Sequence, residues 1–95
     1  MAESPINEEI VAALARILRK VLSHLPDGHQ LTADDRLEDL GVTSFQLMQL
    51  IAAAEQEFDI EFPDSALSLA TFESVGSVAL VVDALATGRA EPPTP

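Results

Sequence analysis

Cysteine is absent from the sequence, and its only aromatic residues are four phenylalanines. Without cysteine the chain has no disulfide framework, no thiolate nucleophile and no cysteine-based zinc site. Any sulfur chemistry must therefore use a sulfur that is brought in from outside. Because aromatics are scarce, the 47% of hydrophobic residues are mostly Leu, Val, Ile and Ala, a composition that favours packed helices.

Basic residues are also few. Five Lys and Arg stand against sixteen Asp and Glu, which gives a formal charge of −11. This charge argues against nucleic-acid phosphates and anionic lipid surfaces as partners, and basic protein surfaces are its natural complement. The acidic residues between positions 34 and 64 lack the order of a calcium-binding loop. We expect them to form a solvated surface, part of which guides basic partners.

Long apolar runs are missing as well. No stretch approaches the roughly eighteen apolar residues of a membrane span, and the start of the chain lacks a basic region followed by an apolar one. We therefore expect a cytoplasmic protein. We also expect it to be a monomer. Its 95 residues are enough for one domain with a single core.

The first predicted element is an amphipathic helix from about Pro5 to Leu22, with Ser4 as its N-cap. Its apolar positions follow the helical period and are Ile6, Ile10, Leu14, Ile17 and Val21. Arg16, Arg19 and Lys20 lie in its last turns, where cations complement the helix dipole. We prefer this stabilising role to a binding role.

A stretch of about twenty residues rich in Pro, Asp, Gly and Thr follows, from Ser23 to Thr43. A structureless loop of this length is unusual in a compact domain, so we expect it to be tied to the bundle. The predicted anchors are Leu31, Leu37 and Leu40. A helical turn is expected between Ala33 and Leu40. His24 and His29 lie here without a second cluster of ligands, and we interpret both as solvated residues rather than metal ligands.

The second helix is predicted from about Ser44 to Phe58. Thr43 is its N-cap, and Gln46 stands three residues later, at the spacing of a capping box. On a helical wheel the apolar residues form two faces roughly 130° apart. One face contains Leu47, Leu50, Ile51, Ala54 and Phe58, and the other contains Phe45, Met48 and Ala52. The first is the expected core. The second is either further core or an exposed anchor for partner proteins.

The last third of the chain predicts two shorter elements. Residues 58–62 alternate like a strand but find no partner strand, so we expect an extended linker with apolar anchors. Asp64 is the predicted cap of a single-turn helix over Ser65 to Leu69. Ser74 is the predicted cap of a last helix that stops near Gly88.

Together these elements predict an all-α fold: a small four-helix bundle of three main helices and one short helix, with a long first loop. The bundle is expected in residues 5–88, after a flexible N-terminus at residues 1–4. Residues 89–95 contain three prolines and are expected to be disordered.

The segment from Leu40 to Leu47 reads Leu-Gly-Val-Thr-Ser-Phe-Gln-Leu and resembles the phosphopantetheine attachment motif of the acyl and peptidyl carrier protein family. That motif is usually Leu-Gly-x-Asp-Ser-Leu, and the match includes Leu40, Gly41 and Ser44. The acidic segment Glu55 to Asp64 and the stretch Thr71 to Val78 are similar to later parts of the family. The resemblance covers nearly the whole chain, residues 6–85.

This resemblance implies a carrier whose Ser44 receives a 4′-phosphopantetheine arm from coenzyme A and tethers acyl or aminoacyl intermediates as thioesters. The chain itself is then not an enzyme. The implied partners are a phosphopantetheinyl transferase, an acyl- or aminoacyl-loading enzyme, and ketosynthase or condensation-type enzymes. The residues expected to contact partners are Thr43, Phe45, Met48, Gln49 and Glu55.

The residues themselves support an accessible hydroxyl at position 44. A hydroxyl in the first turn of a helix is hemmed by few side chains, and Gly41 lets the backbone turn sharply before it. Free backbone N–H groups and the positive end of the helix dipole would lie near an attached phosphodiester. The alternative is that Thr43 and Ser44 only cap the helix.

Two positions depart from the family motif, because Thr43 stands where Asp is usual and Phe45 where Leu is usual. Thr still caps a helix, so capping survives the change. Gln46 and Gln49 are neutral, whereas carriers of primary fatty acid synthesis are typically acidic there. By this resemblance we favour a carrier of polyketide or nonribosomal-peptide biosynthesis. The alternatives are a fatty-acid-synthesis acyl carrier protein and an unmodified helical interaction module, with a small hydrolase that uses Ser44 as a remote third.

Overall fold

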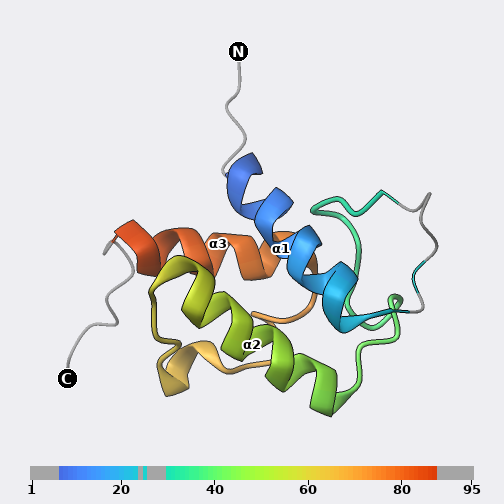
Figure 1. Ribbon diagram of the computed structural model, residues 1–95. Helices are drawn as coiled ribbons and strands as arrows, with labels where there is room; N and C mark the ends of the chain where they lie inside the picture. Colours follow the sequence, from blue (N-terminus) through green and yellow to red (C-terminus); the bar gives the residue numbers. More distant parts are fainter. Residues whose placement is uncertain (1–6, 24, 26–29, 88–95) are drawn as a thin grey trace.

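Three α-helices and one short 3₁₀ helix form the regular structure of the described residues, which are 7–23, 25 and 30–87 of the computed structural model. The elements are α1 (Glu8–Val21), α2 (Ser44–Phe58), η1 (Asp64–Ala66) and α3 (Val75–Thr87) (Figure 1). This arrangement confirms the predicted all-α bundle of three main helices and one short helix. The expected terminal segments, residues 1–4 and 89–95, lie outside the described residues, as do His24, His29 and Gly88.

Helix α1 begins later than predicted. Its N-cap is Asn7, whose side-chain oxygen accepts hydrogen bonds from the backbone N–H groups of Glu9 at 2.9 Å and Ile10 at 3.4 Å. Asn caps a helix at least as well as Ser, and this cap places the start at Glu8 rather than Pro5. Ser4, Pro5 and Ile6 lie outside the described residues. The prediction of Ser4 as the cap was wrong, because Asn7 is the N-cap.

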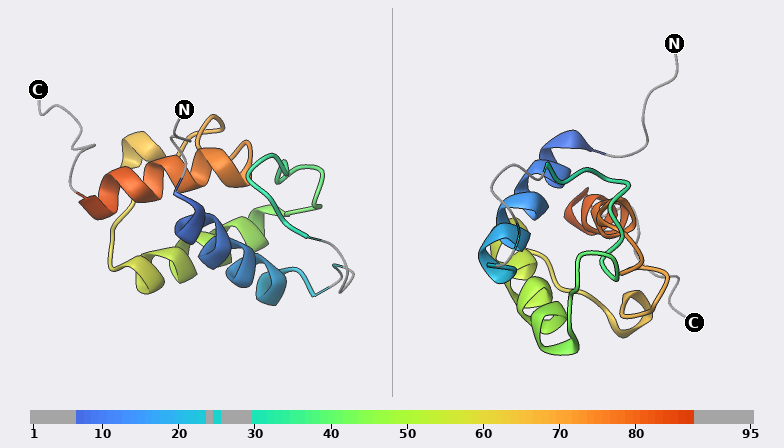
Figure 2. Two further views of the ribbon diagram at one scale, coloured as in Figure 1. Left: turned by 90° about the horizontal axis from the view of Figure 1, so that it is seen from above. Right: turned by 90° about the vertical axis from the view of Figure 1, so that its right-hand side faces the viewer.

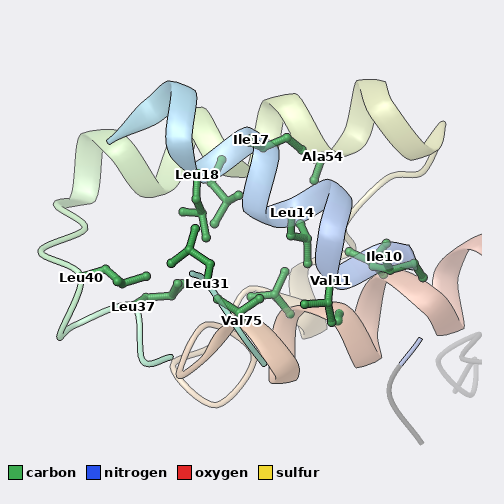
Figure 3. Close-up of a cluster of buried hydrophobic side chains, with 14 of the residues drawn as sticks. Ile10, Val11, Leu14, Ile17, Leu18, Leu31, Leu37, Leu40, Ala54 and Val75 are labelled. Atoms are coloured by element: carbon green, nitrogen blue, oxygen red, sulfur yellow. The ribbon is translucent and has the colours of Figure 1, made fainter. Parts of the chain in front are cut away.

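The core is built around α1, which packs against both α2 and α3, while those two helices contact each other less extensively. Figure 3 shows Leu14 and Leu18 of α1 directed into the cluster that also contains Val75 of α3. The largest fully buried side chains are Leu14, Leu18, Leu22, Leu50, Val75, Val78 and Val82. Apart from Phe62, the buried core is aliphatic, as the scarcity of aromatic residues predicted.

The long first loop is held against the helices by buried side chains and by backbone hydrogen bonds. Leu31, Leu37 and Leu40 are buried, which confirms the predicted anchors. The backbone N–H groups at the start of α3 reach back to the loop: Val75 N donates to Asp35 O at 2.9 Å, and Gly76 N donates to Ala33 O at 2.9 Å. In the right-hand view of Figure 2, the loop passes around the N-terminal end of α3.

No helix forms across Ala33 to Leu40. The segment consists of hydrogen-bonded turns, in which Leu40 N donates to Arg36 O at 3.1 Å and to Leu37 O at 3.2 Å. Arg36 also forms an isolated β-bridge with Ser74. Backbone groups of residues 33, 35 and 37 bond to residues 73–76 at the start of α3 rather than to a continuous helix.

The linker after α2 is extended, as predicted, and it is held by α2 itself. Asp59 ends the helix in the left-handed conformation, with φ 54°. The carboxylate of Glu55 then accepts a hydrogen bond from Phe62 N at 2.9 Å. This bond fixes the linker seven residues further along the chain, where Phe62 enters the core.

Of the two caps predicted for the short helix and the last helix, the structure contains only the second. η1 includes Asp64 as its first residue, and Pro63 occupies the cap position without a side-chain bond, so Asp64 does not cap a helix from Ser65 to Leu69 as predicted. The turn begins one residue earlier because Ala66 N donates to Pro63 O at 2.9 Å. At α3 the prediction is confirmed, since Ser74 Oγ accepts from Ser77 N at 3.1 Å.

No helix in the described part of the chain has the length and apolar character that crossing a membrane requires. Within the same residues, His, Asp and Glu side chains form no group of three or more that could hold a metal ion.

Leu50 tests the core directly, because it projects from α2 with only 1% of its surface exposed. The change Leu50→Ala should lower the free energy of unfolding by about 2–5 kcal/mol, since it removes buried contacts and leaves a cavity. Urea denaturation followed by circular dichroism measures this loss. The matched control is Met48→Ala on the same helix, where the side chain is 68% exposed and a change within about 0.5 kcal/mol is expected. Equal losses would contradict the assigned orientation of α2.

The bond between Glu55 and the linker predicts a second stability effect. Glu55→Ala leaves Phe62 N without its acceptor and should destabilise the protein by about 1–2 kcal/mol. Glu55→Gln should retain most of the stability, because an amide oxygen still accepts the hydrogen bond. The exposed Glu61 gives the control Glu61→Ala, for which little change is expected. A Glu55→Ala protein as stable as this control would show that the bond does not hold the linker.

Candidate functional site

Ser44 is the first residue of α2 and is exposed. No described residue forms a hydrogen bond with its hydroxyl group. The side chain therefore presents a free hydroxyl to solvent at the end of a helix, as the sequence predicted.

Thr43, the residue before Ser44, is the N-cap of α2. Thr43 Oγ1 accepts a hydrogen bond from Gln46 N at 3.2 Å, and Gln46 Oε1 accepts one from Thr43 N at 3.1 Å. These two bonds form the predicted capping box. Because Thr43 and Gln46 form the cap, the Ser44 hydroxyl is not used in capping.

The turn that leads into α2 depends on Gly41, whose φ is 81°. This left-handed conformation is readily adopted only by glycine. Val42 N then donates to Leu37 O at 3.1 Å, which closes the turn just before the cap. The hydrogen-bonded turn through Gly41 and Val42 thus fixes the backbone that leads into Thr43 and Ser44.

The start of α2 also offers free hydrogen-bond donors. The N–H groups of Ser44 and Phe45 have no acceptor among the described residues, as expected for the first positions of a helix. No acidic residue lies in the first turn, and no charged residue occurs from Gly41 to Ala54. An anionic group attached to Ser44 would meet two donors and the positive end of the helix dipole, without a neighbouring carboxylate in α2 to repel it.

The second apolar face of α2 points outward. Phe45 is 71% exposed and Met48 is 68% exposed, and Ala52 is exposed one turn further on. Phe45 and Met48 are therefore exposed rather than part of the core, and their role as an anchor for partner proteins stays a prediction. Thr43 and Gln49 are exposed beside these residues. We call Thr43, Phe45, Met48 and Gln49 the α2 face.

Glu55 does not share this environment. It is half-buried near the far end of α2, and its carboxylate accepts the bond from Phe62 N. Its side chain thus has a structural role that the sequence did not reveal, and we do not include it in the α2 face.

A groove that the sequence did not reveal lies on another side of the α2 start. It has a volume of about 460 Å³ and is bounded by residues 36–38, by Val42 and Leu47, and by residues 69, 70, 72 and 73. Leu69 on its rim is 94% exposed. The two loops that form it are about thirty residues apart in the sequence, so no local pattern could have indicated it.

The chain matches the family model described as the phosphopantetheine attachment site over residues 8–82. It is 34% identical over 79 residues to the aminoacyl carrier protein of Agrobacterium fabrum, a match that covers 82% of this chain and 94% of the relative. The chain also matches chloroplast acyl carrier proteins, of whose length it spans about half, 52%.

Two solved structures are similar. One is the solution structure of a holo acyl carrier protein from Nitrosomonas europaea, with a TM-score of 0.67 and 35% identity over 77% of this chain and 90% of the other. The other is the crystal structure of a Bradyrhizobium japonicum glycine:[carrier protein] ligase complexed with its cognate carrier protein and an analogue of glycyl adenylate. The matched chain of that complex gives a TM-score of 0.62 and 25% identity, over 84% of this chain and 94% of the other.

The family model spans most of the bundle, and the folds of the solved relatives are similar. The chain therefore belongs to the acyl and peptidyl carrier protein family of non-catalytic carriers, whose model describes a phosphopantetheine attachment site.

Proposed function

We propose that Ser44 is the attachment residue of the 4′-phosphopantetheine and that the chain carries aminoacyl groups on it for a dedicated biosynthetic pathway. The observation that supports this most is the exposed Ser44 hydroxyl, which has no hydrogen-bond partner among the described residues although it opens a capped helix. It lies within the segment that resembles the attachment motif.

Attachment is a phosphoryl-type transfer in which Ser44 acts as the acceptor. Its Oγ forms the new bond to the phosphorus that carries the pantetheine of coenzyme A, adenosine 3′,5′-bisphosphate leaves, and the transferase takes the hydroxyl proton. The capping box holds Ser44 at the helix end during this step, since Thr43 and Gln46 bond to each other rather than to Ser44. The free N–H groups of Ser44 and Phe45 then favour the phosphodiester by about 0.3–1 kcal/mol in this exposed setting.

When bound, the prosthetic group supplies a thiol, which a chain without cysteine cannot provide. That thiol would be the group to which a partner enzyme attaches the cargo. The protein's own contribution is to present the tether: a rigid turn through Gly41, a capped helix start and an unobstructed Ser44.

The proposed cargo is an aminoacyl group, loaded by a ligase that works through an aminoacyl adenylate. The similarity to an aminoacyl carrier protein and to a chain in the glycine:[carrier protein] ligase complex supports this choice. The neutral Gln46 and Gln49 on α2 support a specialised pathway of the nonribosomal-peptide or polyketide kind. A fatty acyl cargo is the second candidate, because the chloroplast acyl carrier proteins also match.

The proposed docking surface for the transferase, the loading ligase and later condensation-type or ketosynthase partners is the α2 face. Phe45 and Met48 stand one turn apart on the helix surface next to Ser44, and both are well exposed. Any enzyme that reaches Ser44 must approach this face. Its core is apolar and uncharged, so we expect these two side chains to enter apolar pockets on the partners.

Modification of Ser44 is tested by intact mass after incubation with coenzyme A and a broad-specificity phosphopantetheinyl transferase. The wild-type chain should gain the mass of one phosphopantetheinyl group, and Ser44→Ala should gain none. Ser65→Ala, which removes another exposed hydroxyl, is the control and should be modified like the wild type. An unchanged wild-type mass with several transferases would favour the unmodified interaction module instead.

The role of Phe45 is tested by separating partner turnover from stability. Phe45→Ala should lower kcat/KM for transfer of the arm or for aminoacyl loading by about 5- to 30-fold, the effect of losing an interface side chain that contributes 1–2 kcal/mol. Its melting temperature should change little, because the ring is exposed. Leu80→Ala on α3, with a side chain 43% exposed, is the matched control and should leave both quantities unchanged. A large loss of stability in Phe45→Ala would place the ring in the core.

A further inference from the structure

Basic residues are concentrated in one place on this acidic protein. The chain has five Lys and Arg residues, and three of them, Arg16, Arg19 and Lys20, lie within five positions of the sequence. All three are exposed on the second half of α1. Arg19 and Lys20 fall in its last turn, where they complement the helix dipole. Arg16 lies one turn earlier, so the dipole does not account for the whole cluster.

A groove between α1 and α2 lies beside these residues. It has a volume of about 370 Å³, and the residues that line it are Ile17, Lys20, Val21, Ala53, Gln56 and Glu57. We call it the α1–α2 groove. Ile17 is buried, and Val21 and Ala53 are half-buried, so the groove has an apolar floor. Its volume is near the lower end of the range of ligand pockets, which fits one or two side chains rather than a whole helix.

Two charged residues line the α1–α2 groove, and they differ in their pairing. Glu57 lies 3.6 Å from the guanidinium of Arg16, and this ion pair joins α2 to α1. Lys20 forms no ion pair with a described residue. Arg19 adds a further positive charge at the next position of α1. Three positive charges therefore stand against one negative charge, in a chain whose formal charge is −11.

The neighbouring carboxylates of α2 do not cancel this local charge. Glu55 is half-buried and accepts the hydrogen bond from Phe62 N. Asp59 lies at the C-cap, where the helix ends. Neither residue lines the α1–α2 groove. The charge that an occupant would meet first is therefore the ammonium group of Lys20.

The α1–α2 groove is separate from Ser44. Gln56 follows Gln49 by seven positions and Ala52 by four, so these three residues share one side of α2. At 1.5 Å per residue, however, Gln56 lies about 18 Å along the helix from Ser44. A protein segment bound in the groove therefore need not cover Ser44.

These features favour an acidic protein segment as the occupant. An apolar side chain would cover the floor of the groove, and a carboxylate next to it would meet Lys20. A nucleic acid or an anionic membrane would face the acidic remainder of the surface over a wide area. A short segment meets only the local positive charge, because salt at about 0.15 M screens exposed charges beyond roughly 8 Å.

We propose that the α1–α2 groove is a docking site for an acidic segment of a partner protein. An apolar side chain of that segment enters the groove, and a flanking carboxylate pairs with Lys20. The site selects partners of opposite charge to those that match the acidic surface elsewhere on the molecule. It does not depend on a group attached to Ser44.

The test titrates the ¹⁵N-labelled protein with the end-capped peptide Gly-Glu-Leu-Glu-Gly in about 0.15 M salt. The amide signals of Val21, Ala53 and Gln56 should shift. Gly-Gln-Leu-Gln-Gly, which keeps the leucine and loses both charges, should bind about two- to fivefold more weakly. Gly-Glu-Ala-Glu-Gly should bind about three- to tenfold more weakly than the first peptide, because it loses most of the apolar contact.

Two pairs of variants identify the groups responsible. Lys20→Gln should weaken binding of the acidic peptide by about two- to fivefold and leave the neutral peptide unaffected. Arg36→Gln makes the same change in net charge at an exposed residue outside this groove and should leave both affinities unchanged. Ala53→Leu fills the groove and should remove the shifts, whereas Ala52→Leu at the exposed neighbouring position should not. Lys20 is exposed, so Lys20→Gln remains decisive even if Ala53→Leu lowers stability.

Several results would overturn the proposal. These are an absence of shifts at the groove, equal affinities for the acidic and neutral peptides, and equal losses in Lys20→Gln and Arg36→Gln. The same shifts with inorganic phosphate at matched ionic strength would show an ion-binding patch only. Ser44→Ala should bind the peptide like the wild type. The mass test of Ser44 and the peptide test can therefore fail independently of each other.

Discussion

The capping box at the start of α2 leaves the Ser44 hydroxyl exposed and without a role in capping the helix. A helix start needs acceptors for its free N–H groups, and Ser is as suitable a cap as Thr. Here Thr43 occupies the cap position, since Leu47 N donates to Thr43 O at 2.8 Å and Gln46 N to Thr43 Oγ1. Had the helix begun one residue later, Ser44 would be the cap and its hydroxyl would be used internally. The same register turns Phe45 and Met48 outward and Leu50 inward.

The position of this helix start depends on residues far along the chain. The loop before it is attached to the start of α3 by backbone bonds, including the one from Leu37 N to Glu73 O. Leu37 and Leu40 add buried side-chain contacts. Without such bonds, a loop of this length would be mobile, and the position of Ser44 would not be fixed. The backbone contacts between residues 36–37 and residues 73–74 hold this loop and also form the groove beside the start of α2. One set of contacts therefore produces both features.

Signals that act within one helical turn were enough to predict α2, its capping box and the exposed Ser44. Local preferences could not choose between Ser4 and Asn7 as the cap of α1, because both are good caps, and the structure uses Asn7. The orientation of Phe45 and the bond from Glu55 to Phe62 depend on which segments pack nearby. The groove depends on the pairing of residues 36–37 with residues 73–74, and such long-range pairing has no local sequence signature.

The distribution of charge predicts different roles for the α2 face and for the acidic residues around it. From Gly41 to Ala54 the chain has no charged residue, so contact at the α2 face depends on apolar burial, and its strength should respond weakly to salt. The acidic residues that flank this segment would act over longer distances, and we expect them to influence how fast a basic partner arrives rather than how tightly it is held.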